Sequence, residues 1–150
     1  MLVSLHIFAL SGAGVKSMAM REGDSIADMD IVRRESDDER LLVAVTRGGF
    51  GKRTKVARFK TQARGGKGLI AMKFKSKDDE LVALSQAYED DQILLITQKG
   101  TIVRQSVSVI SEQSRATTGV QLQRLDPDDF VASVAIVPFF EDNGEHQSSS

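Results

Sequence analysis

The sequence has no cysteine and no tryptophan, and its two histidines, His6 and His146, lie near opposite ends of the 150 residues. Without cysteine no disulfide framework can form, and two distant histidines do not make a Cys/His zinc site. The longest apolar run, "MLVSLHIFAL", is too short to span a membrane and has no basic start, so it fits a secretion signal poorly. We interpret it as a buried strand or as the start of a truncated chain.

Patterns typical of catalysis and of nucleotide binding are also missing. The stretch "RGGFGKRT" resembles part of a Walker A loop, but Arg53 stands where that loop needs a Ser or Thr for magnesium. Asp78 and Asp79 lie in a turn-like stretch, Tyr88 precedes acids in a loop, and the serines have no usable histidine partner. We therefore predict no catalytic residue and no metal site, and no enzyme activity for this chain on its own.

Negative charge is absent from one long stretch of the chain. The formal net charge is −1, yet residues 47–77 hold eleven Lys or Arg and no acid. The acids gather instead in stretches such as "ESDDE", "YEDD" and "DPDD". Such an uncompensated positive stretch, which we call the basic strip, favours polyanion binding over a merely soluble surface.

The chain also resembles itself when it is shifted by 51 residues. The matched pairs are Thr46 and Thr97, Gly49 and Gly100, Arg53 and Arg104, Val56 and Val107, Arg64 and Arg115, Gly68 and Gly119, and Asp78 and Asp129. A weaker third copy begins earlier, at Gly14, Met20 and Asp24. Repeats of about 50 residues that each contain four short segments are typical of propeller-like blades.

Within one period the apolar segments predict strands. "GKGLIAMKF", "LVALSQA", "ILLITQKGTIVRQ" and "VSVI" are too short for ordinary helices and rich in Val, Ile and Leu. "ILLIT" and "TIVRQ" predict a hairpin that turns at Gly100, and "KDD" and "PDD" predict turns. A helix over "DDERLLVAV" is the alternative for that segment. We expect the interior to include Val56, Phe59, Leu69 and Met72.

The stretch "RGGKG", residues 64–68, has two interpretations that stay open together. Its glycines would let backbone amides approach a phosphate closely, while Arg64 and Lys67 supply charge. Alternatively, the glycines only turn the chain between blades. Contacts to backbone phosphates would read little base sequence.

Several stretches resemble the C-terminal domain of the DNA gyrase A protein, which is part of a bacterial type II topoisomerase. They are "GVKSMAMREGDSIADMDIV", "TRGGFGKRTKVARF", "ITQKGTIVRQSVSVISEQSRATTGVQLQRL" and "QARGGKG". The last is similar to the gyrase A box, Gln-Arg-Arg-Gly-Gly-Lys-Gly, with Ala63 in place of one arginine. The resemblance implies an all-β fold of propeller-like (β-pinwheel) blades, each of about four antiparallel strands. The chain would hold the last two to three blades of a six-bladed disc.

On this resemblance we divide the chain into five parts. They are a divergent N-terminal segment (1–11), a partial or first blade repeat (12–63), a second repeat (64–114), the start of a third repeat or closing strands (115–138), and an acidic disordered tail (139–150). The basic strip, the box-like motif and the repeat together give the predicted DNA-binding residues: Lys52, Arg53, Lys55, Arg58, Lys60, Gln62, Arg64, Gly65, Gly66, Lys67, Gly68, Lys73, Lys75, Arg104 and Arg115.

The function that the resemblance implies is DNA wrapping. The module would grip duplex phosphates without sequence specificity and support negative supercoiling by the gyrase holoenzyme. Its partners would be double-stranded DNA, the remainder of the gyrase A protein, the ATPase protein of gyrase (gyrase B) and, through exposed blade edges, further copies, with no membrane. ATP and magnesium would belong to other parts of the complex, so no cofactor is expected here. The location would be the bacterial cytoplasm or nucleoid, or a plastid or mitochondrion. A protein-interaction propeller fragment and a topoisomerase IV C-terminal domain are the alternatives.

Overall fold

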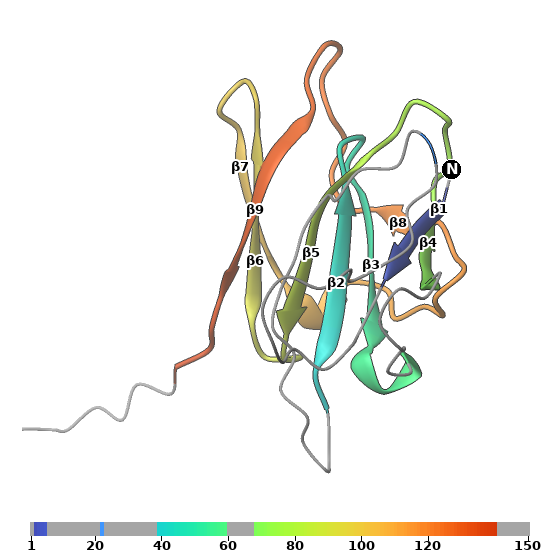
Figure 1. Ribbon diagram of the computed structural model, residues 1–150. Helices are drawn as coiled ribbons and strands as arrows, with labels where there is room; N and C mark the ends of the chain where they lie inside the picture. Colours follow the sequence, from blue (N-terminus) through green and yellow to red (C-terminus); the bar gives the residue numbers. More distant parts are fainter. Residues whose placement is uncertain (1, 6–21, 23–38, 60–67, 141–150) are drawn as a thin grey trace, which may run out of the picture.

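The computed structural model of the chain describes residues 2–5, 22, 39–59 and 68–140. This part of the chain is all-β, as predicted, and contains two short 3₁₀ helices and no α-helix (Figure 1). The elements are β1 (Leu2–Leu5), β2 (Leu41–Thr46), β3 (Phe50–Lys55), η1 (Val56–Arg58), β4 (Leu69–Lys73), β5 (Leu81–Ala87), β6 (Gln92–Thr97), β7 (Ile102–Ser106), η2 (Val107–Val109), β8 (Val120–Gln121) and β9 (Val131–Val137).

The strands form three antiparallel sheets. One has the order β5-β2-β3-β8, the next has the order β7-β6-β9, and β1 pairs with β4. We call the first two sheets the first blade and the second blade. Figure 1 shows them side by side, with β7 at one flank of the molecule and β1, β4 and β8 at the other. The segment Leu41–Thr46, for which a helix is the alternative on sequence alone, is the central strand β2.

The two blades repeat each other in detail, which confirms the hairpin and the turn glycines predicted from the sequence. β2 pairs with β3 as β6 pairs with β7. Gly49 and Gly100 both have positive φ, 85° and 89°, as the tight turns require. In each hairpin the threonine before the turn accepts a hydrogen bond from a backbone N–H four residues later, Phe50 to Thr46 and Thr101 to Thr97.

The predicted aspartate turns are also present, with a one-residue correction to the repeat. Asp79 Oδ1 accepts hydrogen bonds from the N–H groups of Gly48 and Glu80, and Asp129 Oδ1 accepts them from Lys99 and Phe130. Asp79, and not Asp78, is therefore the structural equivalent of Asp129. A bulge in each blade places Leu81 opposite Thr46 and Val131 opposite Thr97. Leu81 and Val131 are therefore equivalent, and the period at this point is 50 residues.

The prediction of a strand at "VSVI" is wrong. Val107–Val109 is a 3₁₀ helix, and Ile110 N–H donates to Val107 O at 3.1 Å. Val107 and Ile110 are both fully buried, whereas Val109 is exposed. A tight turn with three residues per turn places residues i and i+3 on one side, and this satisfies the core better than the alternation of a strand.

The chain that follows the second blade's hairpin crosses to the first blade and completes its sheet. After η2, residues 111–122, which we call the crossing segment, run along the outer edge of β3. Arg53 N–H donates to Ser111 O, Gln113 N–H donates to Arg53 O, and Leu122 N–H donates to Gly49 O. β8, at the end of the segment, supplies the fourth strand of the first blade. The blades are therefore joined by an exchanged strand.

The core lies between the blades and under η1. One cluster combines Leu41, Val43 and Val45 of β2 with Ile93 and Leu95 of β6. The other face of β2 packs through Leu42 on Val56, Phe59 and Ala71, with Leu69 partly buried against them. β2 is buried on both faces, and Met72 is fully buried as well. The predicted interior residues lie inside, Leu69 least deeply.

The crossing segment depends on close approach at Gly119, and this can be tested. Gly119 has φ 76°, and an added Cβ would lie 2.6 Å from Gly51 O, whereas Gly100, with φ 89°, has open space around it. Gly100→Ala should lower the free energy of unfolding by about 1–2 kcal/mol, the cost of left-handed backbone. Gly119→Ala should cost about 1–3 kcal/mol more because of the collision. Urea unfolding of both variants measures this; equal losses would contradict the close approach.

Candidate nucleic-acid interface

The predicted DNA-binding residues divide into those that the structure describes and those that it does not. Lys60, Gln62, Arg64, Gly65, Gly66 and Lys67 lie outside the described residues, so the box-like motif is described only at its last glycine. Gly68 has φ 78°, matching the 76° of its repeat equivalent Gly119. The repeated glycine therefore belongs to the frame of the blade, directly before β4 and β8 respectively.

Two of the predicted arginines lie at one cavity. Arg58 ends η1 and Arg115 lies in the crossing segment, so the cavity joins residues from two repeats. It has a volume of about 740 Å³ and no acid in its lining, which consists of Ala57, Arg58, Gly68, Leu69, Ile70, Ser114, Arg115 and Ala116. We call it the arginine cavity. Among the described residues, Arg47, Arg53 and Lys55 form ion pairs with glutamates, whereas Arg58 and Arg115 take no part in these pairs.

The end of β4 brings a lysine close to the same segment. Lys73 N–H donates to Thr117 O at 3.0 Å, which ties β4 to the crossing segment, and the Lys73 residue is exposed. If β4 continued to residue 77, Lys73, Lys75 and Lys77 would alternate along one face of a strand. Instead β4 ends at Lys73, and the other two lysines follow it in a bend and a turn.

Three further predicted cations have polar partners nearby. Arg53 pairs with Glu89 at 3.2 Å, and its side chain is only 12% exposed. Lys55 lies 3.9 Å from Glu112 and is 57% exposed. Arg104, at the repeat position of Arg53, donates to Gln92 Oε1. Arg53 and Lys55 therefore carry nearby neutralising charge, and an incoming phosphate would compete with these carboxylates.

Lys52 corrects the sequence analysis, because it does not face solvent. The residue is only 1% exposed. Its ammonium donates to Ser114 O at 2.8 Å, Arg115 O at 2.6 Å and Thr117 Oγ1 at 3.0 Å, all in the crossing segment. This lysine holds the exchanged segment against the first blade. The sequence did carry a signal, because the repeat position of Lys52 is occupied by apolar Val103.

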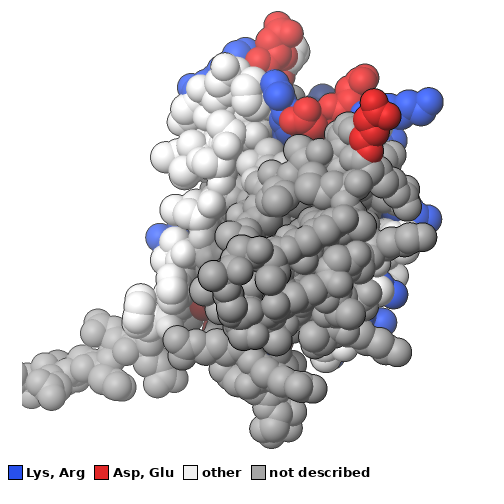
Figure 2. Space-filling view, viewed as in Figure 1, with Lys and Arg blue, Asp and Glu red and all other residues white. Residues whose placement is uncertain are grey.

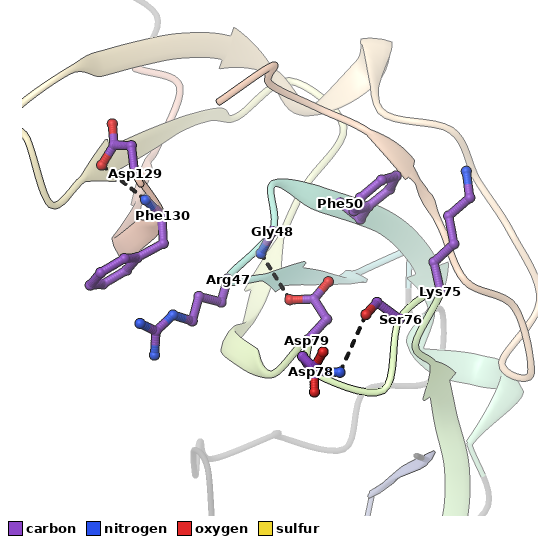
Figure 3. A pocket seen from close by; sticks show the side chains of 9 residues that line it. All are labelled: Arg47, Gly48, Phe50, Lys75, Ser76, Asp78, Asp79, Asp129 and Phe130. Atoms are coloured by element: carbon purple, nitrogen blue, oxygen red, sulfur yellow. Dashed lines mark hydrogen bonds between the residues drawn. The ribbon is translucent and has the colours of Figure 1, made fainter. Parts of the chain in front are cut away.

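A second cavity, of about 430 Å³, lies where the turns of the two blades meet. Figure 3 shows Arg47 and Phe130 on one side of it and Lys75 and Phe50 on the other, with Asp79 between them. The Arg47 guanidinium lies 3.9 Å from the centre of the Phe130 ring, and the Lys75 ammonium lies 5.1 Å from that of Phe50. The contact between Arg47 and Phe130 joins the two blades, whereas the contact between Lys75 and Phe50 does not involve the second blade.

The carboxylates at this second cavity are occupied by backbone amides. Asp79 and Asp129 each accept two N–H groups, as described for the turns above. Desolvation raises the pKa of Asp129, but hydrogen bonds from Thr97, Lys99 and Phe130 lower it, and the pKa is below its ordinary value overall. No group of three or more potential metal ligands occurs among the described residues. These aspartates hold turns.

Charge is unevenly distributed over the molecule. Figure 2 shows described Lys and Arg side chains along the edge of the view on the side of β4 and β8, and mixed charges at the end where the turns lie. The described face over β6, β7 and β9 is nearly uncharged in this view. None of the described residues forms a helix with the length and apolarity of a membrane span.

The repeated blades and the exchanged strand define the class of this protein as a β-propeller repeat domain. A family model described as "DNA gyrase C-terminal domain, beta-propeller" matches residues 7–33, 40–87 and 91–138. The chain belongs to this family. The second and third matched blocks run from β2 to β5 and from β6 to β9. The predicted domain boundaries are not tested by these matches and stay a prediction.

Curated relatives and solved structures agree with this family. The DNA gyrase A protein of Synechocystis sp. is 43% identical over 153 aligned residues, covering 83% of this chain and 18% of the relative. The DNA gyrase A protein of Staphylococcus epidermidis is 36% identical over 140, covering 93% and 16%. The chain thus spans less than a fifth of these relatives.

Two solved C-terminal domains have similar structures. The C-terminal domain of DNA topoisomerase IV has a TM-score of 0.73 at 26% identity and covers 84% of this chain and 38% of that chain. The DNA gyrase A C-terminal domain has a TM-score of 0.59 at 30% identity and covers 65% and 33%. The predicted resemblance and the predicted fold are confirmed.

The buried position of Lys52 predicts a specific pH dependence. Burial lowers the pKa of Lys52 from 10.5 to about 8. Below pH 8 both the folded and the unfolded state carry the charge, so its effect on stability is constant. Between pH 8 and 10.5 the unfolded state binds more protons, so stability rises with pH, by at most about 1.4 kcal/mol per pH unit.

Urea unfolding of the wild type and of Lys52→Met, from pH 7 to 10, isolates this effect. The stability of the wild type relative to the variant should be flat up to about pH 8 and rise above it. A difference that stays constant over the whole range, or that falls, would show that the ammonium is not buried as described.

Proposed function

We propose that this chain is a DNA-binding module of a DNA gyrase A protein that holds duplex backbone phosphates without reading base sequence. The observation that carries the proposal is the arginine cavity, where Arg58 and Arg115 from two repeats line one concave surface without an acid. Arginine binds phosphate oxygens through parallel hydrogen bonds, so two arginines at one cavity suit a phosphate group. Lys73 ends β4, and its N–H is bound to Thr117 O of the crossing segment, so we propose that it adds a third positive charge beside the cavity.

The geometry favours backbone phosphates over base edges. The cavity is lined by η1, β4 and the crossing segment, and the described residues include no α-helix of the kind that enters a major groove. Phosphate contacts position a duplex but carry no sequence information. We therefore propose that Arg58, Arg115, Lys73 and Gly68 form the described part of the interface. Lys60, Gln62, Arg64, Gly65, Gly66 and Lys67 are proposed to extend it, with Arg53, Lys55 and Lys75 contributing at its margin. Arg104, on β7 at the opposite flank, would contact DNA separately from this interface.

The larger role that we propose follows the family. Within a gyrase A protein, a DNA-gripping blade would help to wrap the duplex for negative supercoiling. DNA cleavage would lie in other parts of the gyrase A protein, and ATP hydrolysis would lie in its ATPase partner, so this chain would be non-catalytic on its own and need no cofactor. The relatives come from bacteria, and we propose the bacterial cytoplasm or nucleoid, or an organelle of bacterial descent, as its location.

Salt dependence of DNA binding tests the proposed site. Each neutralised phosphate contributes about 0.9 to the slope of log K against log salt. Arg58→Ala and Arg115→Ala should each weaken binding and reduce that slope by about one, measured by fluorescence anisotropy of a short labelled duplex. Two unrelated duplex sequences should give the same result.

Lys99→Ala is the matched control, because it removes one exposed positive charge elsewhere. The Lys99 ammonium donates to Pro127 O at 2.9 Å in the turn that contains Asp129. This variant should leave the slope unchanged. If Lys99→Ala reduces the slope as much as the arginine variants do, binding is only general charge attraction. If the arginine variants keep the wild-type slope, the phosphates lie elsewhere.

A further inference from the structure

In the first blade, the crossing segment, which we also call the cover, lies along the outer edge of β3. Its pairing shows which kind of strand such an edge binds. The crossing segment pairs with β3 from Ser111 to Leu122, first through Arg53 and then through β8. In the β8 region Phe50 lies opposite Gln121 and Gly51 lies opposite Val120. Near Arg53 the contact is a parallel bridge to Glu112, whereas β8 itself is an antiparallel strand that begins just after a glycine with positive φ, Gly119.

β7 occupies the same place in the second blade, but its outer edge is open among the described residues. Within the described part of the chain, β7 pairs with β6 alone, and Gln105 Nε2 donates a hydrogen bond to Leu122 O of the crossing segment at 2.6 Å. Ile102, at the repeat position of Gly51, is 63% exposed. An exposed apolar strand edge is a ready template for pairing with another strand.

The residues at the two edges indicate which strand would fit β7. In the first blade, a Cβ added at Gly51 of β3 would collide with Leu122 Cδ1 of the crossing segment. The large Leu122 side chain therefore requires glycine at the facing position of β3. At β7 the edge residue is Ile102, which needs a small residue on the cover. The repeat equivalent of Leu122 is Ala71, in β4. Gly68, the equivalent of Gly119, also has the required positive φ.

We propose that the outer edge of β7 binds β4 of a second copy of this chain. Shifting the first-blade pairs by the 51-residue period gives the register, with Thr101 opposite Ile70 and Ile102 opposite Leu69. In a single chain β4 pairs with β1, which places Ser4 opposite Ile70 and Leu5 opposite Leu69. β1 therefore pairs with β4 as β3 pairs with β8. In the assembly, β7 of the second copy takes the place of β1, a strand of four residues.

The two surfaces lie at opposite flanks of the molecule, as Figure 1 shows. The contact is therefore head-to-tail, so an assembly keeps one open β7 at one end and, at the other, one β4 that still pairs with its own β1. Such assembly continues beyond a dimer unless a ring closes.

Cysteine cross-linking tests the register directly, because the natural chain contains no cysteine. Phe50 and Gln121 form a non-hydrogen-bonded pair, since the hydrogen bond from Leu122 N–H to Gly49 O belongs to the next pair. Side chains are closest in such pairs, which suits a disulfide. Thr101→Cys mixed with Ile70→Cys should therefore give a disulfide-linked dimer of the two variants on mild oxidation, in the absence of DNA.

The matched control mixes Thr101→Cys with Leu69→Cys, which is one residue out of register and on the other face. It should give at least tenfold less mixed dimer. Phe50→Cys/Gln121→Cys should link within one chain and verifies the oxidation conditions. Equal yields for Ile70→Cys and Leu69→Cys, or only dimers of Thr101→Cys with itself, would overturn the proposal.

Sedimentation of the wild-type chain without DNA gives a second readout that needs no cysteine variant. The wild type should form dimers and larger species as its concentration rises. Ile102→Lys, which places a charge on the open edge, should stay monomeric at the same concentrations. A wild type that stays monomeric throughout, or an Ile102→Lys variant that assembles equally, would overturn the proposal.

Discussion

The buried ammonium of Lys52 is the interaction on which the joining of the two repeats depends. It donates to two carbonyl groups and one hydroxyl of the crossing segment, which follows the hairpin of the second blade. An ammonium removed from water is costly unless its donors are satisfied, so the chain needs those three oxygens in place. Once they are, β8 is brought beside β3 and Gly119 lies against Gly51. The exchanged strand and the lysine therefore stabilise each other.

The same interaction shapes the proposed DNA-binding surface. Arg115 gives its backbone carbonyl to Lys52, while its residue lines the cavity that Arg58 also lines. Through this carbonyl group, the buried ammonium of Lys52 positions Arg115, an arginine that lines the cavity. Without the crossing segment, Arg58 would remain on η1, but Arg115 would no longer lie at the same cavity. This is how a basic strip along the sequence becomes a concave surface built from two blades.

Much of the fold followed from local pattern, because turns and strand lengths are local properties. Gly49 and Gly100, with the threonines before them, fixed both hairpins, and the aspartates before β5 and β9 fixed both turns. The exchange of β8 could not be read in this way, because periodicity describes which residues alternate but not which sheet receives a strand. The 3₁₀ helix η2 was missed for a related reason, since a buried Val and a buried Ile three residues apart also fit a short strand.

The candidate site was predicted less completely than the fold. Composition identified the basic strip, but its members differ in the structure: Arg58 lies at the cavity, together with Arg115 from outside the strip, while Arg53 pairs with Glu89. Arg47 was not predicted to matter, because its stacking on Phe130 joins residues 83 positions apart. Charge along the sequence therefore predicts the type of ligand, and only the packing decides which cations are presented to it.

The central claim is that Lys52 is buried and that other basic residues of the chain contact DNA. Lysine acetylation, measured by mass spectrometry with and without duplex DNA, tests this claim. Lys52 should resist acetylation in the folded chain under both conditions. Lys73 should react in the free protein and be protected by DNA, and Lys99 should react equally in both. Acetylation of Lys52 at the rate of Lys99, or of Lys73 at the same rate with saturating DNA, would contradict this account.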